Sequence, residues 1–555
     1  MKDFNKIKYE RVDYKTTKEE IDKLITLLKE TTSEEEYIQV ITKINDVSNH
    51  IEEMYDYADI RNMRELSNEY YTKEIEYWNQ EKPKFDALFI PFYKEILNSK
   101  YKETLKMKIP NNFFKIIEYQ LKTTSNKNIE LLTLENELKT KYRTLNNTKI
   151  IFDNEEVTIS KISKHFTDKD RTIRKKAHDT INDFYYEHKS EYTSILFKLI
   201  TVRNKIAKNL GFNSYTDYSL YKLKRFGYDY KDIKNFRDNI ISFVVPLCKQ
   251  LNEIQKKELS LDEIKYYDTV FFNDMPKLKD NLIDNFKESL KEIDDSLYDL
   301  FELMLSNNYI DYESRTDKVN FSITNYLTET HMPVITCNFK SSYLDLITIS
   351  HELGHSFQKY NASIKDKEYI ISPLLKYPTL EIAEMFSYSM ELITMNHVSN
   401  LFTESDYKKY CFMKIYNMIS SLPYICLVDE FQETIYNKEG LKQEEINEIW
   451  NNLVTKYNLE TKNKGHINLE SGGYYYRQSH IFLDPFYYID YALSYFGALA
   501  IWNSSKDNLN TFKEIASVAS YYGFNDLIDK YNMPSPFDKE TVKNTIDNLR
   551  KELEM

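Results

Sequence analysis

Glycine and proline are scarce in this chain, whose 555 residues include 9 glycines and 12 prolines. The first glycine is Gly211, and the only prolines before it are Pro83, Pro91 and Pro110. Because these two residue types interrupt regular structure, their scarcity predicts long helices. Apolar residues recur at helical spacing in residues 21–28, which is typical of an amphipathic helix.

Cysteine and long apolar or basic runs are equally rare. The four cysteines, Cys248, Cys337, Cys411 and Cys426, are widely separated and form no C-x-x-C pair, as expected of free thiols in a reducing compartment. The net charge is −12 and no block of Lys or Arg is present, which argues against nucleic acid or an anionic membrane as a partner. Neither a secretory leader nor an apolar run long enough to span a membrane is evident. We therefore expect a cytoplasmic protein.

Two segments depart from the helical pattern. Residues 150–152 and 157–159 are rich in β-branched and aromatic residues and flank Asp153-Asn154, which predicts a short hairpin. Residues 333–339 predict a second strand, in which the proline at the first position suits a strand start or an edge strand. Gly211 follows a helical segment and suits a helix C-cap. The sequence thus predicts a mainly α protein with a small β-sheet.

Residues 351–355 have the sequence His-Glu-Leu-Gly-His. On a helix, His351 and His355 lie four positions apart on one face, so both imidazoles can reach one cation. Glu352, between them, can turn toward a water on that cation and take its proton. The motif predicts a zinc site that has its own general base.

A hydrolytic zinc site usually has three protein ligands and one open position. Downstream of the histidines, Glu381, Glu384 and Glu391 lie at helical spacing on one face. Acids that face the interior are costly unless a cation or hydrogen bonds satisfy them. One of these acids is therefore a candidate third ligand, and a solvated acidic stripe on a surface helix is the structural alternative.

A tyrosine-rich segment covers residues 474–491. A phenol or an imidazole close to the metal can stabilise the oxyanion that forms when water adds to a peptide carbonyl. Tyr487 and Tyr491, four residues apart, would point the same way on a helix. Because the chain has 47 tyrosines, packing in an amphipathic core is the alternative. Gly472-Gly473 indicates either an ordinary helix end or a mobile loop that closes over a peptide.

Together these segments resemble the zinc oligopeptidases typified by thimet oligopeptidase and oligoendopeptidase F, and most closely their Pz-peptidase-like bacterial branch. In that family the H-E-x-x-H helix is followed by a helix that carries E-x-x-S-x-x-x-E, a pattern that falls here on Glu384, Ser387 and Glu391. A later His, a Phe-Tyr pair and a second Tyr four residues on also match. The resemblance is strong from about residue 155 to the C-terminus and only general before it.

The resemblance implies a set of ligands. His351, His355 and Glu384 would hold one Zn²⁺ per chain, and Glu391 would orient a ligating imidazole. The spacing after His355 is longer than in the best-known members of the family, and Glu381 would fit the shorter spacing better. Glu381 therefore stays the rival third ligand.

The resemblance also implies contacts with substrate. His480 and Tyr487 would contact the substrate or its oxyanion, and Tyr488 and Tyr491 would line the same wall. Gly473 is a further candidate. The family pairs an extended peptide with a strand at the position of residues 333–339, and Asn338 matches the family pattern there.

The implied fold is a multi-helix bowl with a deep substrate channel and a small β-sheet near the H-E-x-x-H helix. Residues 1–190 would form an N-terminal helical wall and residues 191–555 the catalytic domain. The predicted function is a zinc-dependent endopeptidase of short unstructured peptides, with Glu352 as general base. The alternatives are a zinc aminopeptidase, a protease of larger proteins, or a non-catalytic peptide-binding protein.

Overall fold

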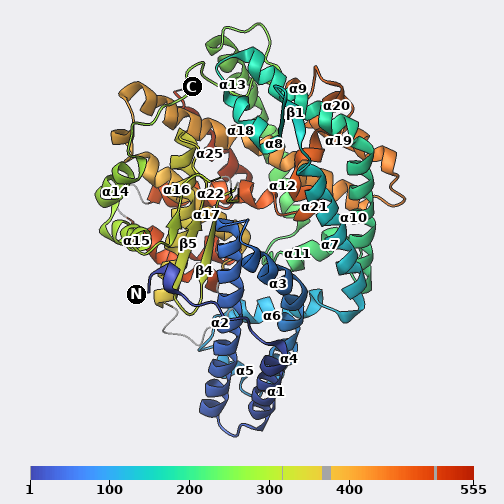
Figure 1. The fold of residues 1–555 in the computed structure, drawn as a ribbon, viewed down its shortest axis with the longest axis vertical. Helices are drawn as coiled ribbons and strands as arrows, with labels where there is room; N and C mark the ends of the chain where they lie inside the picture. The colour runs from blue at the N-terminus through green and yellow to red at the C-terminus, as the bar shows by residue number, and fades with distance from the viewer. Residues whose placement is uncertain (1, 316, 320, 366–376, 505–508, 555) are drawn as a thin grey trace. The chain divides into compact units, whose positions relative to one another are not determined.

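Helices form most of the structure, a computed structural model that describes residues 2–315, 317–319, 321–365, 377–504 and 509–554 (Figure 1). The chain divides into two compact units, each made of three segments. Unit 1 comprises Met1–Leu121, Lys277–Glu404 and Gly497–Met533, and unit 2 comprises Lys122–Pro276, Ser405–Phe496 and Pro534–Met555. The predicted boundary between residues 190 and 191 falls in the first turn of a unit 2 helix, α10 (Lys189–Asn209).

Unit 1 contains the first helices of the chain and a three-stranded sheet. Its helices are α1 (Tyr14–Glu30), α2 (Glu34–Arg64), α3 (Glu69–Leu88), α4 (Ile90–Asn98), α5 (Lys102–Leu105), α6 (Asn111–Thr123, which ends just inside unit 2), α14 (Leu282–Ile293), α15 (Asp295–Ser306), α16 (Tyr343–Lys365), α17 (Leu380–Met395), α23 (Asn510–Val518) and α24 (Phe524–Lys530).

Unit 2 contains the remaining helices. They are α7 (Ile129–Asn146), α8 (Ile159–Ser163), α9 (Arg171–Glu187), α10, α11 (Tyr215–Lys222), α12 (Tyr230–Asn239), α13 (Val245–Glu258), α18 (Glu404–Asn437, whose first residue belongs to unit 1), α19 (Ile446–Lys456), α20 (Ile467–Glu470), α21 (Ser479–Leu483) and α25 (Lys539–Glu552). Helix α22 (Ile489–Ser504) begins in unit 2 and ends in unit 1.

Several local predictions are confirmed. Helix α1 buries Ile21, Ile25 and Leu28 as its spacing predicted. Strands β1 (Ile150–Phe152) and β2 (Glu155–Val157) form an antiparallel hairpin around Asp153-Asn154 as predicted. The second strand, predicted at residues 157–159, lies two residues earlier, and Ile159 begins α8 instead. The two turn residues of the hairpin both have positive φ, 54° and 67°, which is the conformation of a type I′ turn.

The predicted cap at the end of α10 is also confirmed. Gly211 has a φ of 87° and donates its N–H to Lys208 O, while the N–H of Phe212 reaches Ala207 O. This pair of bonds is the Schellman motif, and its left-handed residue is usually glycine because glycine has no Cβ to clash.

The second sheet, which lies in unit 1, has the strand order β3-β5-β4. Strand β5 (Met332–Thr336) is parallel to β3 (Ile310–Asp311) and antiparallel to β4 (Ile323–Leu327). The strand predicted at residues 333–339 is therefore present but ends earlier, and its placement at an edge was wrong. Pro333 is tolerated in this central strand because β3 pairs only with residues 335 and 336, so its missing N–H falls beyond that ladder.

Helix α18 is long and apolar enough to cross a membrane, with a mean hydropathy of 1.3 in its most apolar window. It is the one such helix among the described residues, and 67% of that window is buried inside the structure. A core helix of a folded protein passes the same test. The prediction that no apolar segment is long enough to span a membrane was therefore wrong.

Helices α16 and α17 pack face to face in unit 1. Helix α16 buries a stripe at Leu346, Ile349 and Leu353, and α17 buries Ile382 and Met385. Their closest approach is at Gly354. A Cβ there would lie 2.5 Å from the carbonyl oxygen of Phe386 and 2.6 Å from the Cα of Ser387, so only glycine fits.

We expect Gly354→Ala to destabilise the protein. Alanine favours a helix interior by about 1 kcal/mol, but the clash with the α17 backbone should cost more than this gain, about 1–3 kcal/mol net. The measurement is thermal unfolding followed by circular dichroism. Gly497→Ala is the matched control, because its new methyl would meet the flexible side chain of Met385 and not a backbone. An equal or larger loss in Gly497→Ala would contradict the argument.

Candidate metal centre

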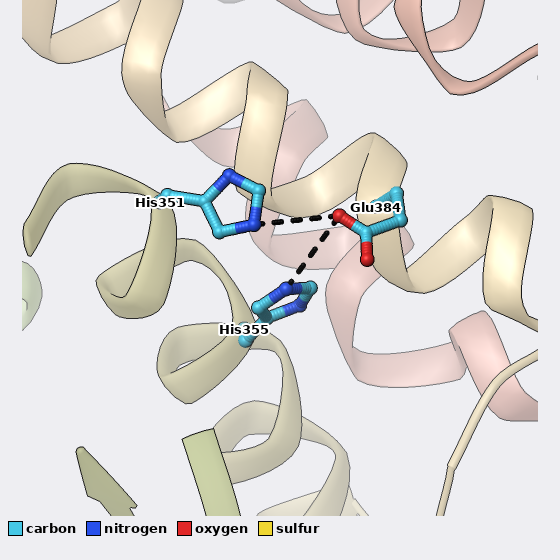
Figure 2. A group of neighbouring side chains, drawn as sticks. All are labelled: His351, His355 and Glu384. Carbon is cyan, nitrogen blue, oxygen red and sulfur yellow. Dashed lines mark ion pairs between the residues drawn. The ribbon is translucent and has the colours of Figure 1, made fainter. Parts of the chain in front are cut away.

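The site is built from the facing surfaces of α16 and α17. His351 and His355 lie on α16 and Glu384 on α17, and all three side chains point toward one spot (Figure 2). Glu384 Oε2 lies 3.4 Å from His351 Nε2 and 3.8 Å from His355 Nε2. Among the described residues this is the only group of three or more His, Cys, Asp or Glu side chains with its ligand atoms within 4.8 Å of one another.

The spacing of these atoms fits a zinc ion. Zinc bonds of 2.0–2.2 Å in a tetrahedral site place neighbouring ligand atoms about 3.4 Å apart. The two observed separations, 3.4 and 3.8 Å, are close to this value. Two imidazoles and one carboxylate also form the donor set of hydrolytic zinc sites, which leave a fourth position open.

Glu391 supports the first histidine from behind. Its Oε1 lies 2.6 Å from His351 Nδ1, and its side chain is buried. A carboxylate at this position accepts the Nδ1 proton, so the Nε2 lone pair is directed toward Glu384. Ser387 supports the third member of the cluster, because its hydroxyl donates to the Glu384 backbone oxygen at 2.8 Å and contacts Oε2 at 3.2 Å.

Burial keeps the second histidine neutral. It lowers the pKa of His355 to about 3, although the neighbouring Glu384 carboxylate opposes this shift. A neutral imidazole keeps the lone pair that a cation needs. His355 is therefore able to act as a ligand at neutral pH.

Glu352, on α16 next to His351, is buried, and its side chain contacts strand β4. Its Oε2 accepts a hydrogen bond of 2.6 Å from the hydroxyl of Thr324. Burial raises the pKa of Glu352 and the neighbouring Glu384 raises it further, while His351, Thr324 and Lys359 oppose the rise. A carboxylate with a raised pKa is a stronger base, as proton abstraction from water requires.

Glu381 is fully buried on α17 but does not belong to the cluster of ligand atoms. The structure thus brings Glu384, and not Glu381, to the two histidines. The assignment of ligands itself stays a prediction.

The sequence argument missed three residues near the cluster. Thr324 bonds Glu352, Lys359 donates to the Thr324 backbone oxygen, and the Tyr388 ring packs edge-on against His351 with centroids 5.4 Å apart. Tyr388 lies inside the acidic motif, where its spacing from Glu384 could have indicated it. Thr324 is distant in sequence and carries no motif.

The predicted substrate residues His480, Tyr487, Tyr488 and Tyr491 form a separate ring cluster in unit 2. The His480 ring lies 5.7, 4.8 and 5.9 Å from the centroids of the three tyrosines. Gln478 fixes the imidazole with a contact of 2.8 Å to its Nδ1. The roles of these residues toward substrate stay predictions.

The rings of Tyr487 and Tyr491 are close, with centroids 5.2 Å apart. The prediction that one helix carries both residues was wrong. Helix α22 begins only at Ile489. Phe486 has a φ of 68°, which a continuous helix does not allow and which is strained for a bulky residue. Both backbone polar groups of Phe486 are hydrogen-bonded: its N–H donates to the Gln432 side chain, and its carbonyl accepts from Arg225.

Two further predicted substrate residues have structural roles. Gly473 is buried, and a Cβ there would clash with Asn468 and Tyr476, so packing accounts for this glycine. The Asn338 amide bonds both backbone groups of Arg315, accepting from its N–H and donating to its oxygen, each at 3.2 Å. Contacts of either residue with substrate stay predictions.

A helix that carries H-E-x-x-H beside a buried acid is the arrangement of hydrolases that activate water on a cation. Comparison with known proteins specifies the class. Residues 165–516 match the peptidase family M3 model, and residues 4–124 match the model of the peptidase M3 N-terminal domain. The chain therefore belongs to peptidase family M3, and it is a peptidase.

Individual relatives agree with this assignment. An oligoendopeptidase F homologue of Borreliella burgdorferi is 26% identical over 72% of this chain and 68% of its own length. One from Lactococcus lactis is 23% identical over 87% and 85%. Among solved structures, a Pz peptidase A with an inhibitor is 28% identical, with a TM-score of 0.92 over 99% of both chains. The predicted mainly α fold is confirmed.

We expect Glu384→Ala to weaken Zn²⁺ binding by more than about 100-fold, because it removes a proposed ligand. Glu391→Gln should weaken binding by about 10- to 100-fold, since it only loosens the His351 imidazole. The measurement is a competition titration of Zn²⁺ against a chromophoric chelator. Glu381→Gln is the control and should bind Zn²⁺ normally. If Glu381→Gln lost the metal and Glu384→Ala kept it, the ligand assignment would be reversed.

Proposed function

We propose that the protein is a zinc-dependent endopeptidase that hydrolyses short unstructured peptides in the cytoplasm. The observation that carries the proposal is the convergence of His351, His355 and Glu384, with Glu352 beside them. The relatives named oligoendopeptidase F support the endopeptidase class. The acidic charge and the absence of a basic run support peptides, and not nucleic acid or a membrane, as partners.

In this proposal each residue of the site has one task. Zn²⁺, held by the two imidazoles and Glu384, would supply Lewis acidity to the reacting water and carbonyl. Glu352 accepts a proton from the attacking water and later donates it to the leaving amide nitrogen. Glu391 keeps the His351 ring in the tautomer and orientation that binding needs.

The oxyanion needs a donor, and the resemblance assigns this task to Tyr487 or His480. A phenol donates without carrying a charge, which suits a site that develops negative charge on oxygen only during the reaction. The ring cluster around His480 would keep Tyr487 in one orientation, and Tyr488 and Tyr491 would line the wall beside it.

The edge of β4 offers backbone groups to an extended peptide. Ile335 donates its N–H to the carbonyl oxygen of Tyr309, just before β3, so its partner Thr324 forms a non-hydrogen-bonded pair across β4 and β5. The N–H of Thr324 therefore points away from β5, and so does its C=O, which already accepts from Lys359. Backbone pairing there would hold peptides of many sequences, since it does not depend on their side chains. This edge replaces residues 333–339 as the proposed peptide strand.

Three alternatives are separated by one substrate series. An aminopeptidase would require a free amino terminus, a protease of larger proteins would cleave folded or long substrates, and a peptide-binding protein would cleave none. Quenched fluorescent peptides of graded length, each with a free or an acetylated amino terminus, distinguish these outcomes. We expect cleavage of short peptides whether or not the terminus is blocked.

We expect Glu352→Gln to lower kcat by about 10²- to 10⁴-fold, because glutamine cannot accept the proton of water. Its Zn²⁺ affinity should stay close to that of the wild type, since Glu352 is not a ligand. A chelator should abolish the wild-type activity, and added Zn²⁺ should restore it. Near-normal turnover by Glu352→Gln would refute the base assignment, and activity that survives metal removal would refute the metal mechanism.

A further inference from the structure

Thr324, on the edge strand β4, makes three hydrogen-bond contacts with α16. Its hydroxyl lies 2.6 Å from Glu352 Oε2 and 3.1 Å from the Glu352 backbone oxygen. Its backbone oxygen accepts a bond of 2.6 Å from the Lys359 ammonium. Thr324 is 7% exposed and Lys359 8% exposed, so these contacts are shielded from water.

The Thr324 hydroxyl has one hydrogen, so it can donate either to the Glu352 backbone oxygen or to Oε2. The backbone oxygen already accepts from Ser356 Oγ at 2.8 Å. The carboxylate oxygen is closer, and a charge-assisted bond is stronger than a neutral one. The hydrogen of Thr324 is therefore directed to Oε2.

We propose that Thr324 is a positioning residue for the general base. By occupying Oε2, its hydroxyl fixes the rotation of the Glu352 carboxyl group and leaves Oε1 for the proton of water. The bond persists when Oε1 carries that proton, because Oε2 remains an acceptor. The inference rests on the proposed function, since it needs Glu352 to act as the base.

Lys359 sets the position of Thr324 itself. It lies seven residues after Glu352 on α16, so two points on one helix hold the same residue of β4. The Lys359 ammonium donates a hydrogen bond to the Thr324 carbonyl, which points away from β5. On an uncovered strand edge, this carbonyl would bind water. The base and the strand that orients it are thereby tied together through α16.

The test compares Thr324→Val, which keeps the shape of threonine but lacks the hydroxyl, with Thr324→Ser, which keeps the hydroxyl. A misplaced base should lower kcat of Thr324→Val by about 10- to 100-fold. KM, Zn²⁺ affinity and the melting temperature should change little, and Thr324→Ser should retain most of the wild-type kcat. Quenched-peptide kinetics, zinc titration and thermal unfolding give these values.

Thr328→Val is the matched control. Thr328 is 6% exposed, follows the same strand, and donates its hydroxyl to Asn49 O at 3.1 Å, away from Glu352. It should reproduce any general cost of removing a buried hydroxyl and leave kcat unchanged. In the Glu352→Gln background, Thr324→Val should have no further effect on residual turnover, because the base it orients is gone.

The outcomes separate the two proposals. If Glu352→Gln is inactive while Thr324→Val has the kcat of the wild type, the positioning role is wrong and the proposed function stands. The same conclusion follows if Thr324→Val and Thr328→Val lose kcat equally. If the wild type cleaves no peptide, or Glu352→Gln is fully active, both proposals fail. Should Thr324→Val not fold, Thr324→Ala replaces it, and equal kcat in the Ala and Ser variants would overturn the inference.

Discussion

The contact between α16 and α17 at Gly354 is the constraint on which the site depends. The two helices approach so closely there that the backbone of α17 occupies the space of a side chain. This close approach lets the Glu384 carboxylate on α17 reach the imidazoles of His351 and His355 on α16. The glycine inside the H-E-x-x-H motif is therefore part of the geometry of the cluster, although it binds nothing itself.

Two buried carboxylates in the same region each have a hydrogen-bond partner. Glu391 faces His351, and Thr324 faces Glu352, so neither carboxylate is buried without a hydrogen bond. The neutral state of His355 follows from burial. This arrangement costs stability wherever an acid is taken out of water, and a cation at the centre would offset that cost.

The sequence could predict the features that local chemistry determines. The Schellman cap at Gly211, the hairpin turn at Asp153-Asn154 and the buried stripe of α1 follow from backbone preference and spacing alone. The central place of β5 could not be predicted, because it depends on pairing with a strand as short as β3. Thr324 was missed for a similar reason, since its contact with Glu352 spans 28 residues and leaves no periodic trace. The left-handed Phe486 likewise needs Gln432 and Arg225, both remote in sequence.

The short strands of the β3-β5-β4 sheet limit how strongly a further peptide strand could pair with its edges. Strand β3 is two residues long, and one outward carbonyl of β4 is already taken by Lys359. A visiting strand would find few backbone groups, each contributing about 0.5–1.5 kcal/mol net. Such an anchor would be weak, and it would not depend on the side chains of the added chain. The same shortness gives a neighbouring molecule little edge on which to grow an aggregate.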